Sequence, residues 1–575
     1  MAHTNTVADH GLHSVAITDA VEDQSRRLAR AWSIVALVVF VGLAVTVGLP
    51  HGPDLETWER QAQVSTLVVL AVGTAIAWRW EGIGGSLMLV GAVALGVFAA
   101  LQHQPLIAFL PATAFLVPAV AFLVAWHRTR TYIAVVTLAT ILAVVLVSGS
   151  LAAQAMYDHG YGAAHPQSEL TALPDSAVVW HWSGGVTPTQ AVIVARVEDA
   201  ANAILDVGAP GGALASYPGT ETDGVWRFEA ADLQPATTYT YTFRVDGTVV
   251  PERSGSFTTF ADGPTSFTVA AGSCSRLGSN GVVYETILGR QPDLFVVPGD
   301  FFYADHMETS RHFTEAFDQT LTQPAQATLL SSVPVAYVWD DHDYGGNDAD
   351  GSAPTRDFAR TAYSTYVPHY PLSETGTINQ AFTIGRVRFV MLDTRSERDP
   401  KSDPDGEGKT MLGAEQLEWL QRELEQSAER YPLIVLVSSV PWIATAEPGA
   451  DHWGGYATER RKIADFIAEA NNVSSLLMLA GDAHMIAIDD GTNSNYSAAG
   501  DVTFPLLHAA ALDRPGSVKG GPYSEGTYPG GGQFGLIEVA DTGTAEITVR
   551  ISGWDWTGTE LVGYSFSVPA PEVAP

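Results

Sequence analysis

The run WDDHD, residues 339–343, places three carboxylates and a histidine at the end of the apolar stretch VPVAYVW. We predict that this stretch is a buried strand. Clustered charge at a strand end costs desolvation and like-charge repulsion unless a cation compensates it. The sequence therefore predicts metal ligands in this run.

The same arrangement, an apolar run followed by polar ligand types, occurs at three other places. DLFVVPGD ends at Asp300, LLMLAGDAH carries Asp482 and His484, and SFTVAAGSCS carries Cys274, the only cysteine of the chain. In open α/β sheets the carboxyl ends of the strands form the edge where sites are found. This recurrence predicts a metal-dependent hydrolase whose site is built from several strand ends.

The carboxylates suit a pair of cations. Asp300 follows a glycine and can bridge two ions, while either Asp341 or Asp340 supplies a second carboxylate. Asp482 and His484 stand two residues apart, so both can face the ions from one sharp turn. Two neighbouring cations activate water and polarise a phosphoryl group.

Two further residues have candidate roles in this chemistry. His342 is a candidate acid for the leaving oxygen, because an imidazole titrates near neutral pH. A single cysteine excludes an intrachain disulfide, which leaves burial or metal ligation as the alternatives for Cys274.

Six segments in order, GSCS, PDLFVVPGDFFYAD, WDDHDYGGND, FVMLDTRS, LGAEQLEWL and AGDAH, resemble the alkaline phosphatase D (PhoD-like) branch of the calcineurin-like metallophosphoesterases. The resemblance covers about residues 173–565. It implies a four-layer αββα metallophosphoesterase domain with a dinuclear centre that hydrolyses phosphate esters. It also implies Fe³⁺ held by cysteine and tyrosine with Ca²⁺ beside it, and another divalent metal is the alternative.

The resemblance implies a role for each matching residue. The iron ligands would be Cys274, Tyr303 and His484, with Asp300 as the bridge. The calcium ligands would be Asp341, Asp482 and Asn347.

Two residues would act on the substrate. His342 would be the general acid, and Arg395 would clamp phosphate oxygens. A structural ion pair of Arg395 with Asp393 or with a neighbouring loop is the alternative. The chain departs from many two-metal phosphoesterases at Ser438 and Ser439, where they use a histidine, so the number of calcium ions stays open.

The elements that position these residues form the C-terminal part of the chain. Strand patterns alternate with helical ones such as AEQLEWLQRELEQSAER and TERRKIADFIAEAN, so we assign residues 263–570 to the α/β PhoD-like metallophosphatase domain. We expect its last strands, 534–569, in a second sheet packed on the first. Residues 173–262 alternate like short strands and predict a small fibronectin- or immunoglobulin-like β-sandwich, preceded by a linker at 156–172.

The N-terminal part is apolar. Five runs, each near the ~20 residues that span a bilayer, occupy about 32–49, 63–78, 84–101, 106–126 and 131–153. They predict an all-α region of five transmembrane helices over residues 31–155, after a cytoplasmic tail at 1–30.

Basic residues set the predicted orientation. Arginines before the first run and after the second and fourth place the N-terminus in the cytoplasm by the positive-inside rule, and the catalytic domain outside. The expected localisation is the cell membrane, as a multi-pass protein. The whole chain has 30 basic and 63 acidic residues, a net charge of −33, which argues against a nucleic-acid-binding surface.

These observations favour a membrane-anchored, extracytoplasmic, metal-dependent phosphoesterase, an alkaline phosphatase or phosphodiesterase. One alternative is a phospholipase D-like diesterase at the membrane surface, and another is a non-catalytic sensory or binding module on the same fold. Intact Asp300, His342, Asp482 and His484 weigh against the non-catalytic module. The sequence determines neither the natural substrate nor the oligomeric state.

Overall fold

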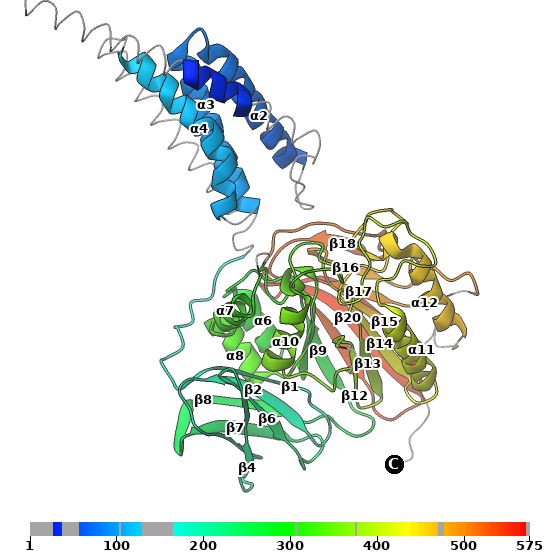
Figure 1. Cartoon of the computed structure of the whole chain (residues 1–575). Coiled ribbons are helices and arrows are strands. Elements are labelled where there is room, and N and C mark those ends of the chain that lie inside the picture. Colours follow the sequence, from blue (N-terminus) through cyan, green and yellow to red (C-terminus); the bar gives the residue numbers. More distant parts are fainter. Residues whose placement is uncertain are drawn as a thin grey trace, which may run out of the picture. The chain divides into compact units, whose positions relative to one another are not determined.

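The chain folds as two compact units, Met1–His159 and Gly160–Pro575. The computed structural model describes residues 27–36, 57–102, 105–128, 165–304, 307–373, 376–469, 476–500 and 502–570. Figure 1 shows helices in the first unit and mixed helices and strands in the second.

The first unit contains α2 (Thr57–Ala77), α3 (Glu81–Gln102) and α4 (Pro105–Arg128). Leu70, Met88 and Phe115 are fully buried in one apolar cluster shared by these helices. Gly84 allows a close approach, because a Cβ there would lie 2.1 Å from the backbone nitrogen of Ala77.

The predicted five-span transmembrane region is wrong. Across the described ranges, no helix has both the length and the apolar character that a membrane crossing requires. Some apolar residues of α2 to α4, among them Leu70, Met88 and Phe115, pack on one another, and the hydropathy of a run does not show what the run packs against. The expected run at 131–153, and most of that at 32–49, lie outside the described residues. Two further predictions depended on these spans: the lipid bilayer as a partner, and a multi-pass localisation with an exported catalytic domain. Both are wrong for the same reason.

Ten described strands of the second unit form one sheet with the order β21-β20-β19-β9-β10-β11-β1-β2-β6-β5. The neighbours β9, β10, β11 and β1 are parallel, and the remaining pairs are antiparallel. The bounds are β1 Val178–Gly184, β2 Ala191–Val197, β5 Thr220–Thr222, β6 Val225–Ala230, β9 Phe267–Ala271, β10 Leu294–Pro298, β11 Val335–Val338, β19 Gln533–Ala540, β20 Glu546–Asp555 and β21 Glu560–Pro569.

Seven described strands form a second sheet with the order β12-β13-β14-β15-β17-β16-β18. Its bounds are β12 Gln380–Ile384, β13 Val387–Met391, β14 Leu433–Ser438, β15 Leu476–Ala480, β16 Met485–Asp489, β17 Leu506–Ala509 and β18 Gly526–Pro529. A four-stranded sheet contains β3 (Ala203–Gly208), β4 (Ala215–Pro218), β7 (Thr238–Val245) and β8 (Thr248–Thr258).

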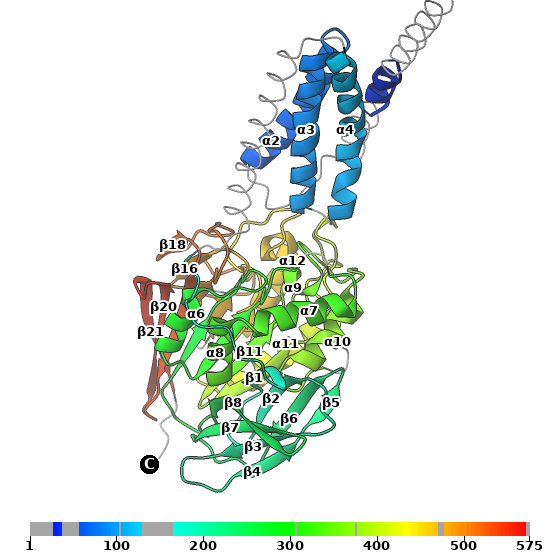
Figure 2. The same cartoon turned by 90° about the vertical axis from the view of Figure 1, so that its left-hand side faces the viewer.

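The two large sheets pack face to face, with β16 and β17 against β19 and β20. Their facing side chains, among them Val435, Leu479, Ile537 and Val549, are fully buried in one core. Figure 1 places α6 to α8 and α10 on one side and α11 and α12 on the other, and Figure 2 shows β20 and β21 from the edge. The helix bounds are α6 Val282–Gly289, α7 Ser310–Leu321, α8 Pro324–Ser332, α9 Asp341–Tyr344, α10 Arg356–Tyr366, α11 Ala414–Ala428, η1 Trp453–Tyr456 and α12 Ala457–Glu469.

The predicted fold class is therefore corrected to a mixed α/β fold with large sheets, and no five-span all-α region is found among the residues that the structure describes. The C-terminal strands β19 to β21 pair beside β9 in the first sheet, and not in a second one as expected. Strands β1, β2, β5 and β6 extend the same sheet, because Gly184 of β1 pairs with Val335 of β11. Local patterns predict strands, but backbone hydrogen bonds between distant segments decide their neighbours.

Candidate metal centre

The predicted ligands follow strand ends of both large sheets. Cys274 comes after β9, Asp300 after β10 and Asp341 after β11, whereas Asp482 comes after β15 of the other sheet. These four strands are buried along their whole length, apart from Thr268 of β9. Their short apolar runs fit central strands that are covered on both faces.

Three of these residues have left-handed backbone conformations. The φ angles are +61° at Cys274, +52° at Asp300 and +70° at Asp482. Residues with a side chain seldom adopt this region, and such strain concentrates at functional sites. The backbone therefore takes an uncommon conformation at a predicted ligand after each of these three strands.

Two glycines allow the ends of the two sheets to meet. A Cβ on Gly299 would lie 3.1 Å from Cβ of Ser439, which follows β14 of the other sheet, and one on Gly481 would lie 2.4 Å from the carbonyl oxygen of Pro298. Gly481 follows β15 of one sheet, and Pro298 ends β10 of the other. The glycine before each aspartate is therefore needed where the sheets converge.

Asp300 lies at the junction of two groups of ligand atoms. The first group consists of Asp300, Asp341 and His342, and the second of Asp300, Asp340 and Asp482. Within each group the ligand atoms lie within 4.8 Å of one another. Burial raises the pKa of Asp300 and Asp340 well above the usual carboxyl range and that of Asp482 to about 6, and Asp341 adds to each shift. Such a concentration of buried carboxylates favours a bound cation.

Two orphaned oxygens support the same conclusion. Oδ2 of Asp340 and Oδ2 of Asp482 are buried and have no hydrogen-bond partner among the described residues. Buried polar atoms normally have a partner, and an unpaired buried carboxylate oxygen is costly. A cation beside Asp300 would satisfy both, so the donor set fits a metal centre.

Cys274, Tyr303 and His484 lie next to this acidic group. Cys274 Sγ is 3.5 Å from Oδ2 of Asp300, and the phenol oxygen of Tyr303 is 2.7 Å from Nε2 of His484. Tyr303 also packs against Cys274. Nδ1 of His484 is 2.8 Å from the carbonyl oxygen of Pro515, so this nitrogen carries the proton and Nε2 is left as the ligand atom.

The thiol and the phenol are neutral in the absence of a cation. Burial, followed by the charge of Asp300, raises the pKa of Cys274 and of Tyr303 well above their ordinary values. A cation would reverse this shift, because a metal deprotonates a coordinating thiol.

His342 lies within the same group. Its ring stacks on the ring of Tyr303 with the centroids 3.7 Å apart. Its backbone N–H donates to Oδ1 of Asp341 at 3.0 Å and to Oδ1 of Asp300 at 3.3 Å. The structure thus places the predicted acid among the predicted ligands.

Asn347 makes its contact one residue farther along. Its amide donates to Oδ2 of Asp348 at 2.8 Å, and the backbone N–H of Asp348 donates to Oδ2 of Asp341 at 2.6 Å. Asn347 therefore connects to the group through Asp348.

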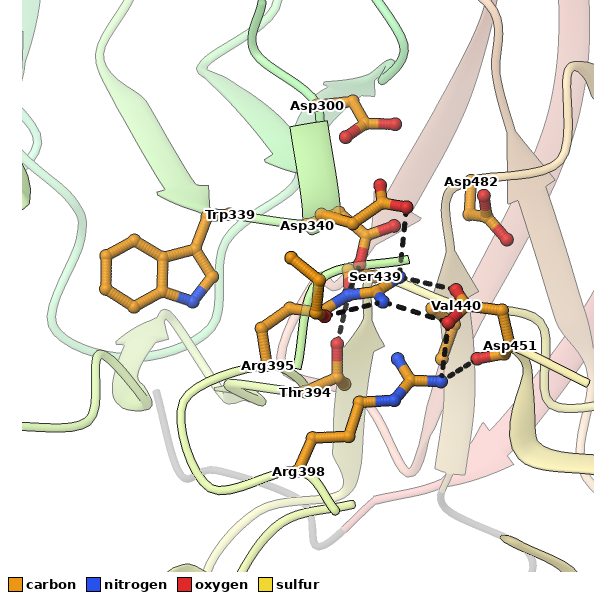
Figure 3. Close-up of polar contacts among 12 residues, drawn as sticks. Asp300, Trp339, Asp340, Thr394, Arg395, Arg398, Ser439, Val440, Asp451 and Asp482 are labelled. Carbon is orange, nitrogen blue, oxygen red and sulfur yellow. Dashed lines mark hydrogen bonds and ion pairs between the residues drawn. The ribbon is translucent and has the colours of Figure 1, made fainter. Parts of the chain in front are cut away.

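Arg395 is held in a buried ion-pair network, shown in Figure 3. Its side chain is fully buried, its Nε donates to Oδ1 of Asp340 at 2.6 Å, and its Nη2 pairs with Oδ2 of Asp451 at 2.7 Å. This geometry favours the structural ion pair over the phosphate clamp. The guanidinium of Arg395 pairs mainly with Asp340 and Asp451. Asp393 contacts Arg395 through the backbone, where its Oδ1 accepts from the N–H of Arg395 at 3.1 Å.

The structure adds Asp343 and Lys519 to the site, and it also places there Asp340, which the sequence offered as the alternative to Asp341. Asp340 offers its free Oδ2 while Arg395 and Ser439 hold its Oδ1, and its place directly after the strand was the available sequence signal. Asp343 accepts from the backbone N–H of Phe301 and of Asp340, and thereby joins the loop after β10 to the loop after β11. Lys519 lies 2.7 Å from Oδ1 of Asp482, a contact that no sequence pattern indicated.

Comparison with known families identifies part of the chain. Residues 267–516 match the family model described as PhoD-like phosphatase. Residues 19–134 match a domain of unknown function (DUF7670).

Individual relatives agree with the family match. Alkaline phosphatase D of Bacillus subtilis (strain 168) is 28% identical over 184 residues, which are 27% of this chain and 31% of that protein. The chain therefore matches less than a third of that relative's length. The match supports the prediction of a phosphate ester hydrolase.

Solved structures show the same fold at low sequence identity. A structure of PhoD has a TM-score of 0.55 at 18% identity and covers 68% of this chain and 93% of its own. The purple acid phosphatase PPD1 of yellow lupin (Lupinus luteus) seeds has a TM-score of 0.51 at 14% identity and covers 68% of this chain and 74% of its own.

Proposed function

We propose that this chain hydrolyses phosphate esters at a dinuclear metal centre where its two large sheets meet. The observation that carries the proposal is the buried carboxylate of Asp300, which lies within 4.8 Å of a carboxylate oxygen of Asp341 and, in a second group, of Asp340 and Asp482. A residue shared in this way suits a bridging ligand. The family match at residues 267–516 supports the same reaction class.

The donor types favour two different ions. Cys274, Tyr303 and His484 offer a thiol, a phenol and an imidazole, which suit Fe³⁺. Asp340, Asp341 and Asp482 offer carboxylate oxygens, which suit a hard cation such as Ca²⁺. When bound, the ions polarise the phosphoryl group and stabilise its developing charge.

The side chains of the site provide the remaining functions. His342 protonates the leaving oxygen, a role that suits an imidazole held by its backbone between Asp300 and Asp341. Arg395 and Ser439 fix Oδ1 of Asp340, so that Oδ2 of the same carboxylate faces the centre.

The reaction class is tested with the full chain, purified without chelator, on one phosphate monoester and one phosphate diester. We expect hydrolysis by the natural sequence and its loss in Asp300→Asn, together with reduced metal content. The rate ratio gives the preference between the two esters. Bound metal without turnover of either ester would instead favour the binding module.

The metal assignment has a separate, spectroscopic test. If Cys274 and Tyr303 bind Fe³⁺, the purified chain absorbs visible light, and Tyr303→Phe and Cys274→Ser each change that band. A colourless, iron-free and fully active chain would remove iron from the proposal while leaving the hydrolysis intact.

A further inference from the structure

The segment between β17 and β18 runs along the candidate metal centre. The backbone N–H of Leu512 donates to the carbonyl oxygen of Ser273, and that of Asp513 donates to the carbonyl oxygen of Cys274, at 2.8 and 3.1 Å. Farther along, the N–H of Ser517 donates to the carbonyl oxygen of His484 at 2.9 Å. The segment is thereby fixed to predicted ligands from both sheets.

This segment brings two cations to the centre. The guanidinium of Arg514 lies 4.3 Å from the centroid of the Tyr303 ring. The ammonium of Lys519 lies 2.7 Å from Oδ1 of Asp482, and a third of its side chain, 33%, is exposed. One cation therefore contacts the tyrosine of the iron side, and the other contacts a carboxylate of the acidic side.

The backbone position of Lys519 is fixed by its neighbours. The N–H of Gly521 donates to the carbonyl oxygen of Ile443 at 2.7 Å, and the phenol of Tyr523 donates to the carbonyl oxygen of Lys519 at 3.3 Å. Gly520 has φ +71°, and a Cβ there would lie 2.3 Å from the oxygen of Ile443. These contacts fix the backbone at Lys519, from which its ammonium reaches Asp482.

Lys519 meets the needs of a phosphate-binding group better than Arg395 does. The guanidinium of Arg395 is fully buried and already donates to Asp340 and Asp451. An ammonium has three donors, so Lys519 can hold Asp482 and an incoming phosphate oxygen at the same time. A cation bound by Asp482 would share the charge of that carboxylate and leave Lys519 more available to an anion.

We propose that Lys519, supported by Arg514, binds the non-bridging phosphate oxygens of the substrate in the role the sequence suggested for Arg395. The inference rests on the proposed function, because it assigns a substrate-binding residue to the same site. Lys519 lies beyond residue 516, where the match to the family model ends.

The test uses the metal-loaded full chain and inorganic phosphate as the probe. Calorimetric titration gives the dissociation constant for phosphate, and steady-state kinetics give KM and kcat. Lys519→Gln should weaken phosphate binding at least about tenfold, because a charge-assisted hydrogen bond is lost. It should raise KM in parallel while the metal content stays the same. Arg514→Gln should have a smaller effect of the same sign, and Lys519→Arg should recover part of the affinity.

Lys462→Gln is the matched control. Lys462 pairs with Glu407 at 2.8 Å and its side chain is 35% exposed, close to the values for Lys519, but its partner lies outside the candidate ligands. This variant should bind phosphate like the natural sequence. Equal losses in both variants would show a general charge effect and overturn the inference.

Two further outcomes separate this inference from the proposed function. If the chain hydrolyses esters but Lys519→Gln keeps its phosphate affinity and KM, or loses metal, Lys519 is a structural partner of Asp482 and the inference fails alone. If phosphate binding depends on Lys519 but no ester is hydrolysed, Lys519 is a phosphate-binding residue and the proposed hydrolysis fails.

Discussion

Replacement of Arg395 by glutamine tests whether this residue supports the fold or binds the substrate. The natural side chain is fully buried and pairs with Asp340 and Asp451, so the substitution removes a buried charge and leaves its partners behind. We expect a large loss of stability, and little change in phosphate affinity per metal-loaded molecule.

The expected magnitude follows from the partners that remain. Breaking a buried ion pair by removing one partner costs about 3–5 kcal/mol. Asp451 keeps a second cation, because Arg398 lies 3.1 Å from its Oδ1. Asp340 keeps the hydroxyl of Ser439 on its Oδ1 but no cation of the protein among its contacts with the described residues. The unpaired charge is thus mainly that of Asp340. We expect the free energy of unfolding to fall by about 3 kcal/mol, near the lower end of that range.

The assay is urea unfolding of the full chain, followed by tryptophan fluorescence. Arg388→Gln is the matched control, since Arg388 pairs with Glu423 at 2.8 Å while both side chains are 20% exposed. A partly exposed pair contributes about 1 kcal/mol or less. Equal losses of unfolding free energy in Arg395→Gln and Arg388→Gln would refute the structural role of Arg395. Preserved stability with a raised KM would restore the phosphate clamp.

Three other perturbations test different parts of the reasoning. Gly481→Ala should destabilise the chain and lower its metal content, because the new Cβ would lie 2.4 Å from the carbonyl oxygen of Pro298. Gly408→Ala is the control and should leave stability unchanged, because no atom lies within 4 Å of its added Cβ. Chelation should lower the urea midpoint of the natural chain and lower it less in Asp482→Asn, since a bound cation stabilises the folded state. Burial lowers the pKa of His181 to about 3, so the unfolded chain, with a pKa of about 6.5, binds the proton first as the pH falls. The free energy of unfolding should therefore fall as the pH drops through about 6.5. His181→Gln should remove about 1 kcal/mol of the loss between about pH 6.5 and about pH 5.5, as measured from urea curves at these two pH values.

The strands that carry the site were predictable from local sequence. The runs before Cys274, Asp300, Asp341 and Asp482 are strands in the structure, and the helices expected near 414 and 458 are present as α11 and α12. A short apolar run that ends in glycine and a charged residue fits a buried strand better than other secondary structures. Both the hydrophobic pattern and the residues that end the strand are local properties of the sequence. The metal roles of these residues remain predictions.

The choice between neighbouring residues could not be made locally. Asp340 and Asp341 have the same side chain, but Asp340 sits in extended backbone, with φ −123°, before the helix that begins at Asp341. Their carboxylates therefore point to different partners: Oδ1 of Asp340 accepts from Arg395, and Oδ2 of Asp341 accepts from the backbone of Asp348. Only the turn geometry separates them.

The N-terminal prediction failed for a related reason. A hydropathy pattern counts apolar residues, whereas Leu70, Met88 and Phe115 are buried against one another in the described helices. The hydropathy of a run does not show whether lipid or other helices of the protein will contact its apolar side chains.

The sequence by itself determined which residue types are available to the site. These are the carboxylates at the ends of apolar strands, a histidine, a tyrosine and the single cysteine. Tertiary structure decided which charges meet. Arg395 pairs with Asp451, 56 residues away, and Lys519 pairs with Asp482, 37 residues away. The physical reason is that a charge becomes structural or substrate-binding according to its burial and its partners, and both arise only when distant strands converge.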